Sequence, residues 1–192
     1  MPDLGLQAQA ERHFGFLLLG KGYRCTESTP YRVRFDSPGA FIELVFDGNR
    51  SYELGLLVGK AGGESSGTHP YSIDEILRLK RAPEAERFSL VQVTSTEALA
   101  SFVAQLAEML RSHGTDFITG NEKSFSELAE QRRREVQNYA IERDLRAARA
   151  EAESAWRVKD YAAVVTALRP LRGALAAAEV GKLEFAEKQC RE

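Results

Sequence analysis

Apolar and polar side chains alternate between residues 31 and 58, and this two-residue period constrains the fold more than any other feature of the chain. Successive side chains point to opposite faces of a β-strand, so the alternation predicts strands with one apolar face. Ser37-Pro38-Gly39 and Asp47-Gly48-Asn49 interrupt it and are typical of tight turns. The alternating runs are 31–35, 42–46 and 52–58, with 23–27 as an additional short run. The sequence therefore predicts an antiparallel meander of three or four strands.

Helical spacing of apolar residues precedes and follows this region. The first 20 residues have the period of an amphipathic helix, and Lys21-Gly22 provides a glycine stop. Three hydroxyl residues are each followed three positions later by glutamate, which is the pattern of a capping box at a helix start. These pairs are Ser72 with Glu75, Thr94 with Glu97, and Ser124 with Glu127. The helix after the second pair has the most continuous apolar stripe, and we expect it to cover the apolar face of the meander.

The last third of the chain has the composition of helices. From about residue 122 onward there is no strand pattern, and alanine, arginine and glutamate dominate. The apolar stripe there is broken, which predicts one or two long, partly exposed helices up to Trp156. Shorter helices are expected from Tyr161 to Leu168, ended with the help of Pro170, and from about Ala176 to Gln189.

These elements predict an α+β fold, with an antiparallel β-meander packed by helices in residues 1–116 and an all-helical C-terminal region in residues 117–192. A content of 43% hydrophobic and 28% charged residues is typical of globular proteins. The net charge of −2 is spread evenly, since the first region carries 12 Lys or Arg against 15 Asp or Glu and the second carries 14 against 13. Neither region has the basic excess that binding to nucleic-acid phosphates requires, so we expect no nucleic-acid partner.

The N-terminal segment argues against secretion and membrane insertion. Asp3 occupies a position where a signal peptide is basic, and the longest unbroken apolar run there, Phe16 to Leu19, is too short to cross a bilayer. Cys25 and Cys190 lie far apart in the sequence, which excludes a disulfide framework and leaves a single bridge open. Cys25 falls in an alternating run, where packing is its expected role. We therefore expect a cytoplasmic protein with reduced thiols and no membrane partner.

The sequence lacks the spacings of common catalytic and cofactor sites. The glycine-rich segment 59–67 differs from a phosphate-binding P-loop because Lys60 is not followed by Ser or Thr. None of the three histidines has a neighbouring ligand at metal-binding spacing. We therefore expect no cofactor, no metal and no enzymatic activity. An enzyme with a dispersed site remains open if Glu43, Glu53 and His69 meet within hydrogen-bond reach.

Arg32 and Arg34 occupy alternate positions of one predicted strand, so they share a face and form a small cationic strip. Such a strip can receive an acidic partner, or it can be a solvated face with local ion pairs. Aromatic residues often anchor protein interfaces, and charged neighbours steer the encounter. The candidate anchors are Tyr31, Tyr52 and Tyr139. These five residues are the predicted binding residues, on the exposed meander or on the long helix rich in Glu and Arg.

One short segment carries a resemblance to a repeat family. Lys159-Asp160-Tyr161-Ala162-Ala163-Val164-Val165 resembles the turn and second helix of a tetratricopeptide repeat, over about 152–175, although the glycine usual in that turn is absent. The resemblance implies a helical hairpin. A groove in such repeat arrays needs at least three stacked units. A lone unit therefore favours a packed hairpin over a peptide-binding platform.

Several strand and helix strings carry a second resemblance. These strings are Tyr31 to Phe35, Tyr52 to Leu54, Tyr71 to Leu77 and Glu179 to Leu183. In them the chain is similar to small uncharacterised bacterial α+β proteins with a helical tail, and some proteins of this general size and make-up are immunity partners of bacterial toxins. The similarity implies a cytosolic protein that acts by binding another protein.

The function that we expect is therefore a non-catalytic protein-binding module, either immunity-like or an adaptor. Its partner would be another protein, and the long helix with its broken apolar stripe makes a homodimer a reasonable expectation as well. The alternative is a small-molecule-binding protein. Its pocket would lie between the meander and the 94–113 helix, closed by the loop at 61–70.

Overall fold

The computed structural model describes residues 3–62 and 69–191, and it confirms the predicted α+β fold. The chain divides into two compact units, residues 1–131 (unit 1) and residues 132–192 (unit 2). Unit 1 contains the sheet and its covering helices, and the described part of unit 2 is helical. The long helix α5 (Glu122–Arg157) contributes to both units.

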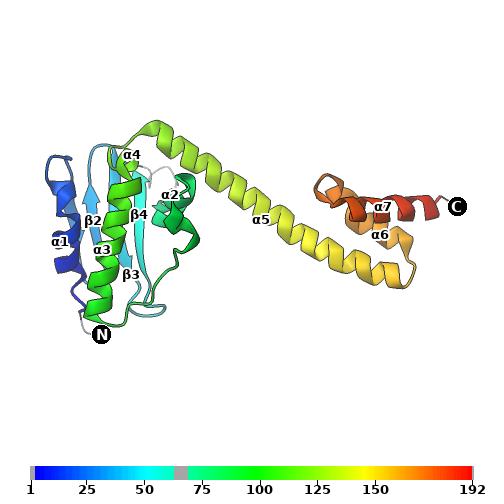
Figure 1. Cartoon of the computed structure of the whole chain (residues 1–192), viewed down its shortest axis with the longest axis horizontal. Helices are drawn as coiled ribbons and strands as arrows, with labels where there is room; N and C mark the ends of the chain where they lie inside the picture. Colours follow the sequence, from blue (N-terminus) through cyan, green and yellow to red (C-terminus); the bar gives the residue numbers. More distant parts are fainter. Residues whose placement is uncertain (1–2, 63–68, 192) are drawn as a thin grey trace. The chain divides into compact units, whose positions relative to one another are not determined.

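Five strands form one antiparallel sheet in the order β1-β2-β3-β4-β5, a meander without crossovers (Figure 1). They are β1 (Arg24–Ser28), β2 (Arg32–Asp36), β3 (Ala40–Phe46), β4 (Leu54–Lys60) and β5 (Tyr71–Ser72). The alternating runs correspond to the first four strands, and the two predicted turns separate β2 from β3 and β3 from β4. The sequence pattern does not predict β5, because two residues are too few to show an alternation.

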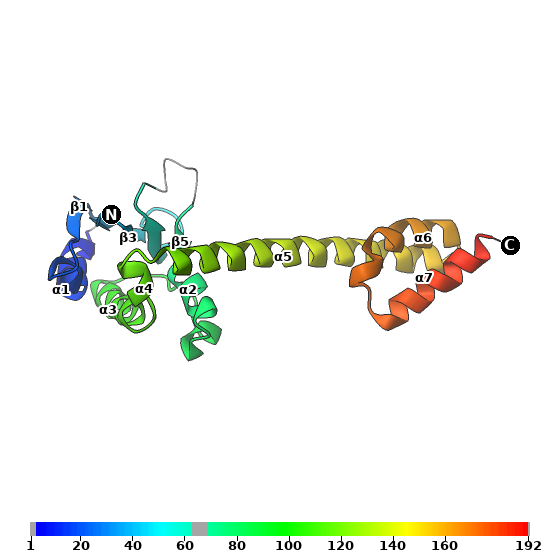
Figure 2. The ribbon, with the colours of Figure 1, turned by 90° about the horizontal axis from the view of Figure 1, so that it is seen from above.

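The apolar face of the sheet is covered by α1 (Leu6–Leu18) and α3 (Thr96–His113), which lie on the same side of it (Figure 2). This confirms the predicted place of the 94–113 helix. The shorter helix α2 (Ile73–Leu79) packs against α3 and β4, and a 3-10 helix (Pro83–Glu86) follows it. Each large side chain buried in this layer contributes roughly 1.5–3 kcal/mol to folding. Fully buried residues of the layer include Phe14, Val33, Phe35, Ile42, Leu44, Val58, Val103 and Leu106.

The predicted capping pair is present at the start of α2, whereas α3 is capped by a different residue. Before α2, the Glu75 carboxylate accepts a hydrogen bond from the Ser72 backbone N–H at 2.9 Å, as predicted. Helix α3 is capped by Ser95 instead of Thr94, and the Ser95 hydroxyl accepts a hydrogen bond from the Ala98 N–H at 3.2 Å. Both hydroxyl residues are good N-caps, so the spacing to the glutamate alone cannot choose between them.

The third capping pair is displaced by three residues, in the segment that ends unit 1. Helix α4 (Thr115–Ile118) precedes α5, which begins at Glu122. The side-chain oxygen of Asn121 accepts a hydrogen bond from the Ser124 N–H at 3.1 Å, so Asn121 has the role predicted for Ser124. Apolar residues of this segment belong to the core of unit 1, namely Phe117, Ile118, Phe125 and Leu128. The compact unit therefore extends beyond residue 116.

Gly120 allows this segment to approach the turn between β2 and β3. Its φ of +71° lies in the left-handed region that favours glycine. A Cβ at Gly120 would lie 2.9 Å from the Cα of Gly39, closer than real Cβ contacts allow. The start of α5 is thus held against the end of the sheet where the candidate site lies.

Unit 2 consists of the C-terminal part of α5, then α6 (Tyr161–Leu168), a 3-10 helix (Arg169–Ala174) and α7 (Ala177–Gln189) (Figure 1). The predicted bounds of the last two α-helices are confirmed to within one residue. Ion pairs join α7 to its neighbours, and the Arg149 Nε lies 2.5 Å from the Glu179 carboxylate. The core is small and consists of Ala148, Ala152, Ala155, Val164, Val165, Leu168, Leu183 and Ala186.

The turn between α5 and α6 is a Schellman motif. The Asp160 N–H donates to the Ala155 carbonyl at 3.0 Å, and the Lys159 N–H donates to the Trp156 carbonyl at 3.1 Å. Lys159 has a φ of 59°, in the left-handed region where glycine is usual and other residues are strained. The glycine that the sequence lacks in this turn would therefore occupy the position of Lys159.

Replacing Lys159 with glycine is expected to stabilise unit 2 by about 0.5–1 kcal/mol, because glycine relieves the left-handed strain but adds entropy to the unfolded chain. Urea unfolding followed by the fluorescence of Trp156, the only tryptophan, measures this change. Lys159→Ala keeps the strain and should give no gain. A stabilisation of the same size in both variants would show that the lysine side chain, and not the backbone, is responsible.

The structure bears on the expectations for the cysteines and for a membrane-spanning helix. Cys25 and Cys190 are both exposed, so the expected packing role of Cys25 is wrong. The reason is that β1 is an edge strand, where a bulge between Cys25 and Glu27 interrupts the pairing with β2. Within residues 3–62 and 69–191, no helix is long and apolar enough to span a bilayer.

Candidate functional site

The second face of the sheet, called here the outer face, carries Arg32, Arg34, Phe41 and Glu43. In the described part of unit 1, Figure 2 shows α1, α2 and α3 on the opposite side only. Arg34 lies directly opposite Glu43 in the pairing of β2 with β3. Glu43 is nevertheless only 2% exposed, because side chains of this face cover it.

Both arginines hold the Glu43 carboxylate. The Arg32 Nε donates a hydrogen bond to one of its oxygens, and the Arg34 guanidinium lies 3.9 Å from the other. A buried carboxylate requires such partners, since an unpaired charge in this position would be strongly destabilising. Arg32 also lies 3.5 Å from Glu27, and its own side chain is 44% exposed. Arg32 is therefore the most exposed member of this network, followed by Glu27 at 38%.

Asp36 extends the network along β2. The Arg34 Nε donates to the Asp36 carboxylate at 3.0 Å, and the Thr26 hydroxyl donates to it as well. Burial raises the pKa of Asp36, but the hydrogen bonds from Arg34 and Thr26 outweigh it and hold the pKa below its ordinary value of 3.8. The group is thus a carboxylate at neutral pH, and the network contains alternating charges of both signs.

Phe41 connects this network to a cavity. The Arg34 guanidinium carbon lies 3.9 Å from the centre of the Phe41 ring, a stacked cation–π contact. The Phe41 ring lies over Gly59 of the neighbouring strand, where a Cβ would be only 2.2 Å from the ring. The glycine therefore provides the space that lets the ring lie flat on the sheet.

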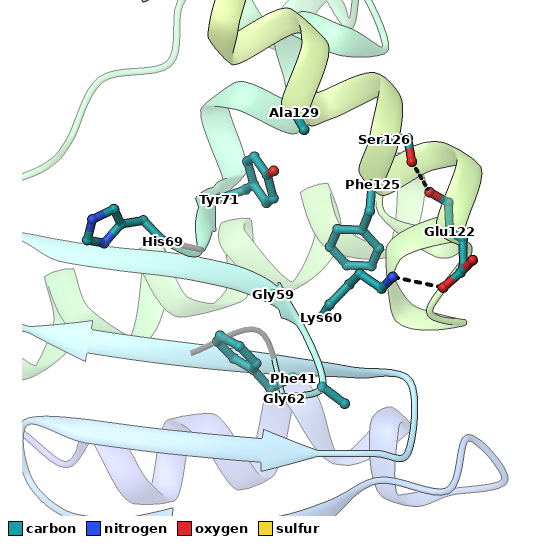
Figure 3. Close-up of a pocket in the computed structure, with 11 residues that line it drawn as sticks. Phe41, Gly59, Lys60, Gly62, His69, Tyr71, Glu122, Phe125, Ser126 and Ala129 are labelled. Carbon is teal, nitrogen blue, oxygen red and sulfur yellow. Dashed lines mark hydrogen bonds and ion pairs between the residues drawn. The ribbon is translucent and has the colours of Figure 1, made fainter. Parts of the chain in front are cut away.

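The cavity beyond Phe41, called the Phe41 cavity, has a volume of about 350 Å³ and lies between the β3–β4 end of the sheet and the start of α5 (Figure 3). Its walls include the rings of Phe41, Tyr71 and Phe125. Tyr71 and Phe125 are themselves in contact, with ring centres 6.2 Å apart. All of the described residues that line the cavity belong to unit 1.

Polar groups lie at the side of the cavity formed by α5. The Lys60 Nζ donates a hydrogen bond to the Glu122 carboxylate at 2.8 Å, and this contact lowers the pKa of Glu122 (Figure 3). The Ser126 hydroxyl donates to the Glu122 carbonyl at 2.9 Å. His69 lines the cavity from the chain entering β5. The cavity therefore has aromatic walls, with polar groups on the α5 side and His69 apart from them (Figure 3), an arrangement that suits binding of an apolar group.

The structure brings together only some of the predicted binding residues. Arg32 and Arg34 share a face as predicted, but they are paired with carboxylates and do not form a free cationic strip. Tyr31 lies at the end of the other face, stacked on Phe46 with ring centres 6.5 Å apart. Tyr52 is partly buried in the turn after β3, where the Val93 N–H donates to its carbonyl. Tyr139 is 71% exposed on α5, in unit 2.

The dispersed catalytic set does not converge. Glu43 is held by two arginines in the middle of β3. Glu53 precedes β4 and bridges to Gln92 at one end of the β3–β4 pair, whereas His69 lines the cavity at the other end. The cross-strand register thus separates the three side chains.

The Phe41 cavity is not the pocket that was expected between the meander and the 94–113 helix. Where α3 meets the sheet, the side chains form the buried core of unit 1. The Phe41 cavity instead lies beside α5, so the sequence analysis missed Phe41, Tyr71 and Phe125 as site residues. Gly59 inside a strand was the available signal, because such a glycine often marks a close approach. The expected closing loop falls largely on residues 63–68, outside the described residues.

Within the described ranges, no group of three or more His, Cys, Asp or Glu side chains is placed to hold a metal ion. Comparisons of the chain with protein-family models, with curated proteins and with solved structures find no match. The outer face and the Phe41 cavity are therefore the features of the chain that bear on its function.

Proposed function

We propose that the chain is a cytoplasmic, non-catalytic protein-binding module, and that unit 1 contacts its partner through the outer face of the sheet. The observation that carries this proposal is the position of Phe41, which joins an aromatic cavity to an arginine and carboxylate network. Apolar pockets beside arginines are typical of the energetic centre of protein interfaces.

Each part of this surface has a distinct role in the proposal. The Phe41 cavity receives one apolar side chain of the partner, which is buried against Tyr71 and Phe125. Arg32, with its 44% exposed side chain, contacts an acidic group at the rim. Exposed charge pairs contribute little affinity, about 0–1 kcal/mol, but they orient the encounter. The anchor in the cavity therefore supplies most of the binding energy.

An immunity-like role is one form of this proposal. An immunity protein acts by covering the surface of another protein, which requires a complementary face and no catalytic group. An adaptor would use the same face. Both roles belong to this proposal, together with the cytoplasmic location.

A second candidate function is the binding of a small molecule in the same cavity. Its volume of about 350 Å³ falls at the lower end of the range typical for ligand sites, roughly 300–1,000 Å³. Three aromatic walls and the polar groups of Lys60, Glu122 and His69 favour a small, partly apolar ligand.

Ser126→Trp tests the proposal, because Ser126 is exposed on α5 and its side chain borders the cavity, so a tryptophan there fills the space. The full chain, tagged, serves as bait in its native host, and the affinity of each retained protein is then measured with purified components. We expect Ser126→Trp to weaken the specific partner at least tenfold, about 1.4 kcal/mol. Ser101→Trp on α3 is the matched control, since Ser101 is exposed and distant from the cavity lining.

The outcomes separate the two functions. Equal binding by both variants and the unchanged chain would overturn the proposed contact surface. A metabolite that stabilises the unchanged chain but not Ser126→Trp would favour the small-molecule function. At a hundred times its dissociation constant, such a ligand should add about 2.7 kcal/mol to the free energy of unfolding.

A further inference from the structure

Unit 2 contains a cluster of three aromatic rings at the margin of its small buried core, against which two of the rings pack. Trp156 comes from the end of α5, Tyr161 from the start of α6 and Phe185 from α7. Their ring centres lie 5.5–5.7 Å from one another. Phe185 is 47% exposed, and Trp156 and Tyr161 are partly buried. Three elements thus present one aromatic surface to solvent.

Two lysines of α7 flank these rings, although the hydrogen bond from Arg149 and, to a lesser extent, the charge of Lys182 lower the pKa of nearby Glu179. The Lys182 ammonium lies 4.9 Å from the centre of a Trp156 ring. Lys188 is exposed and follows Phe185 by one helical turn, so both lie on the same face of α7. Neither lysine forms an ion pair with the described residues. By contrast, arginines elsewhere in unit 2 do form ion pairs, including Arg149, Arg169 and Arg172.

Unit 2 as a whole has a net positive charge, like the two lysines beside the rings. Residues 132–192 contain 13 Lys or Arg against 10 Asp or Glu, whereas residues 1–131 contain 13 against 18. The even distribution seen with a boundary at residue 116 therefore conceals a basic unit 2 and an acidic unit 1. An acidic ligand is attracted to unit 2 before any specific contact forms.

We infer that Trp156, Tyr161, Lys182, Phe185 and Lys188, called the aromatic patch, are a docking surface for an acidic peptide segment that carries an apolar side chain. Aromatic rings bury the apolar group at a low entropic cost, and the two lysines meet the carboxylates beside it. The charge of the patch selects this occupant over a basic or a neutral one. This surface is in unit 2, so it is independent of the function proposed for unit 1.

Trp156 is the only tryptophan and lies within the patch, which makes its emission a direct readout in the full chain. The probe is the acetylated, amidated peptide Asp-Glu-Leu-Phe-Glu-Asp, which contains no tryptophan. We expect a saturable change in Trp156 emission that weakens as salt is added. A peptide with lysine in place of each acidic residue, and one with alanine in place of Leu and Phe, should bind at least about fivefold more weakly.

Matched variants connect the signal to the patch. Lys182→Glu should weaken the probe at least about fivefold, and Lys21→Glu in unit 1 makes the same change of charge without effect. Phe185→Ser should weaken it about tenfold or more, and Leu19→Ser, which replaces another exposed apolar residue, should not. Equal loss in a variant and its control, or equal binding of acidic and basic peptides, would overturn the inference.

Two further experiments test whether the aromatic patch binds a membrane or a second copy of the chain instead. Vesicles of phosphatidylserine that change Trp156 emission when the acidic probe does not would assign the patch to a membrane surface. A dimer that forms without any peptide and is lost in Phe185→Ser, measured by sedimentation, would assign it to a second copy of the chain. Either result contradicts docking of an acidic peptide.

Discussion

Leu183→Ala should destabilise unit 2 by about 2–5 kcal/mol, because Leu183 is fully buried and the small core has little capacity to close the resulting space. Four of the eight core residues are already alanines. A unit of this size, residues 132–192, is expected to have only about 3–5 kcal/mol of stability from its core. The substitution therefore removes most of the stability of unit 2.

Urea unfolding measures this effect with two probes. Trp156 emission reports unit 2, and hydrogen exchange of the β3 and β4 amides reports the sheet of unit 1. We expect the Trp156 midpoint to fall steeply while the strand amides remain protected. Val158→Ala is the control, because Val158 is 75% exposed and its truncation should change stability by less than about 0.5 kcal/mol. Loss of protection in β3 and β4 by the same amount would mean that the two units unfold together.

The elements with strong local signals are those that the sequence predicts best. Helix α6 has the predicted bounds because both of its ends are locally determined. The Asp160 carboxylate accepts a hydrogen bond from the Ala163 N–H at 3.0 Å, and Pro170 follows the last residue by two positions. The alternating strands are predicted for the same reason, since their period is visible in five to seven residues.

The extent of unit 1 depends on tertiary contacts that no local pattern contains. Phe125 and Leu128 lie on the same helix as Ala148 and Ala152, yet the first pair is buried in unit 1 and the second in unit 2. Their sequence spacing is helical in both places. The contact of Gly120 with Gly39 joins residues 81 positions apart in the sequence, and it helps to hold the first turns of α5 beside the sheet.

The candidate site was only partly accessible to sequence reasoning. Alternation correctly placed Arg32 and Arg34 on one face, but their pairing with Glu43 depends on the register set by the turn between β2 and β3. That register converts an expected cationic strip into a network of ion pairs. The cavity required Phe41, Tyr71 and Phe125 to meet, and these come from three elements whose apolar residues otherwise look like core.

Glu43→Ala should lower the free energy of unfolding of unit 1 by about 3 kcal/mol, because it leaves two arginines beside a buried position without their shared carboxylate. This loss of stability is at the low end of the roughly 3–5 kcal/mol typical of breaking a buried ion pair, because Arg32 keeps Glu27 and Arg34 keeps Asp36 as partners. Glu43→Gln retains a hydrogen-bond acceptor and should cost less. Urea unfolding followed by the exchange of the strand amides measures both.

Glu53→Ala is the matched control, because Glu53 lies on the same hairpin and its side chain forms no ion pair with the described residues. If Glu53→Ala lowers the free energy of unfolding as much as Glu43→Ala does, the effect comes from the hairpin and not from the network.

Replacing Arg32, Arg34 and Glu43 together with Met, Met and Leu removes the buried carboxylate and both of its cations, which often restores stability at buried ion pairs. Glu27 and Asp36 lose these partners but are partly exposed to solvent. If that variant is stable but no longer binds the partner retained by the unchanged chain, the network serves recognition. If it is stable and still binds, the Phe41 cavity alone carries the interaction proposed for unit 1.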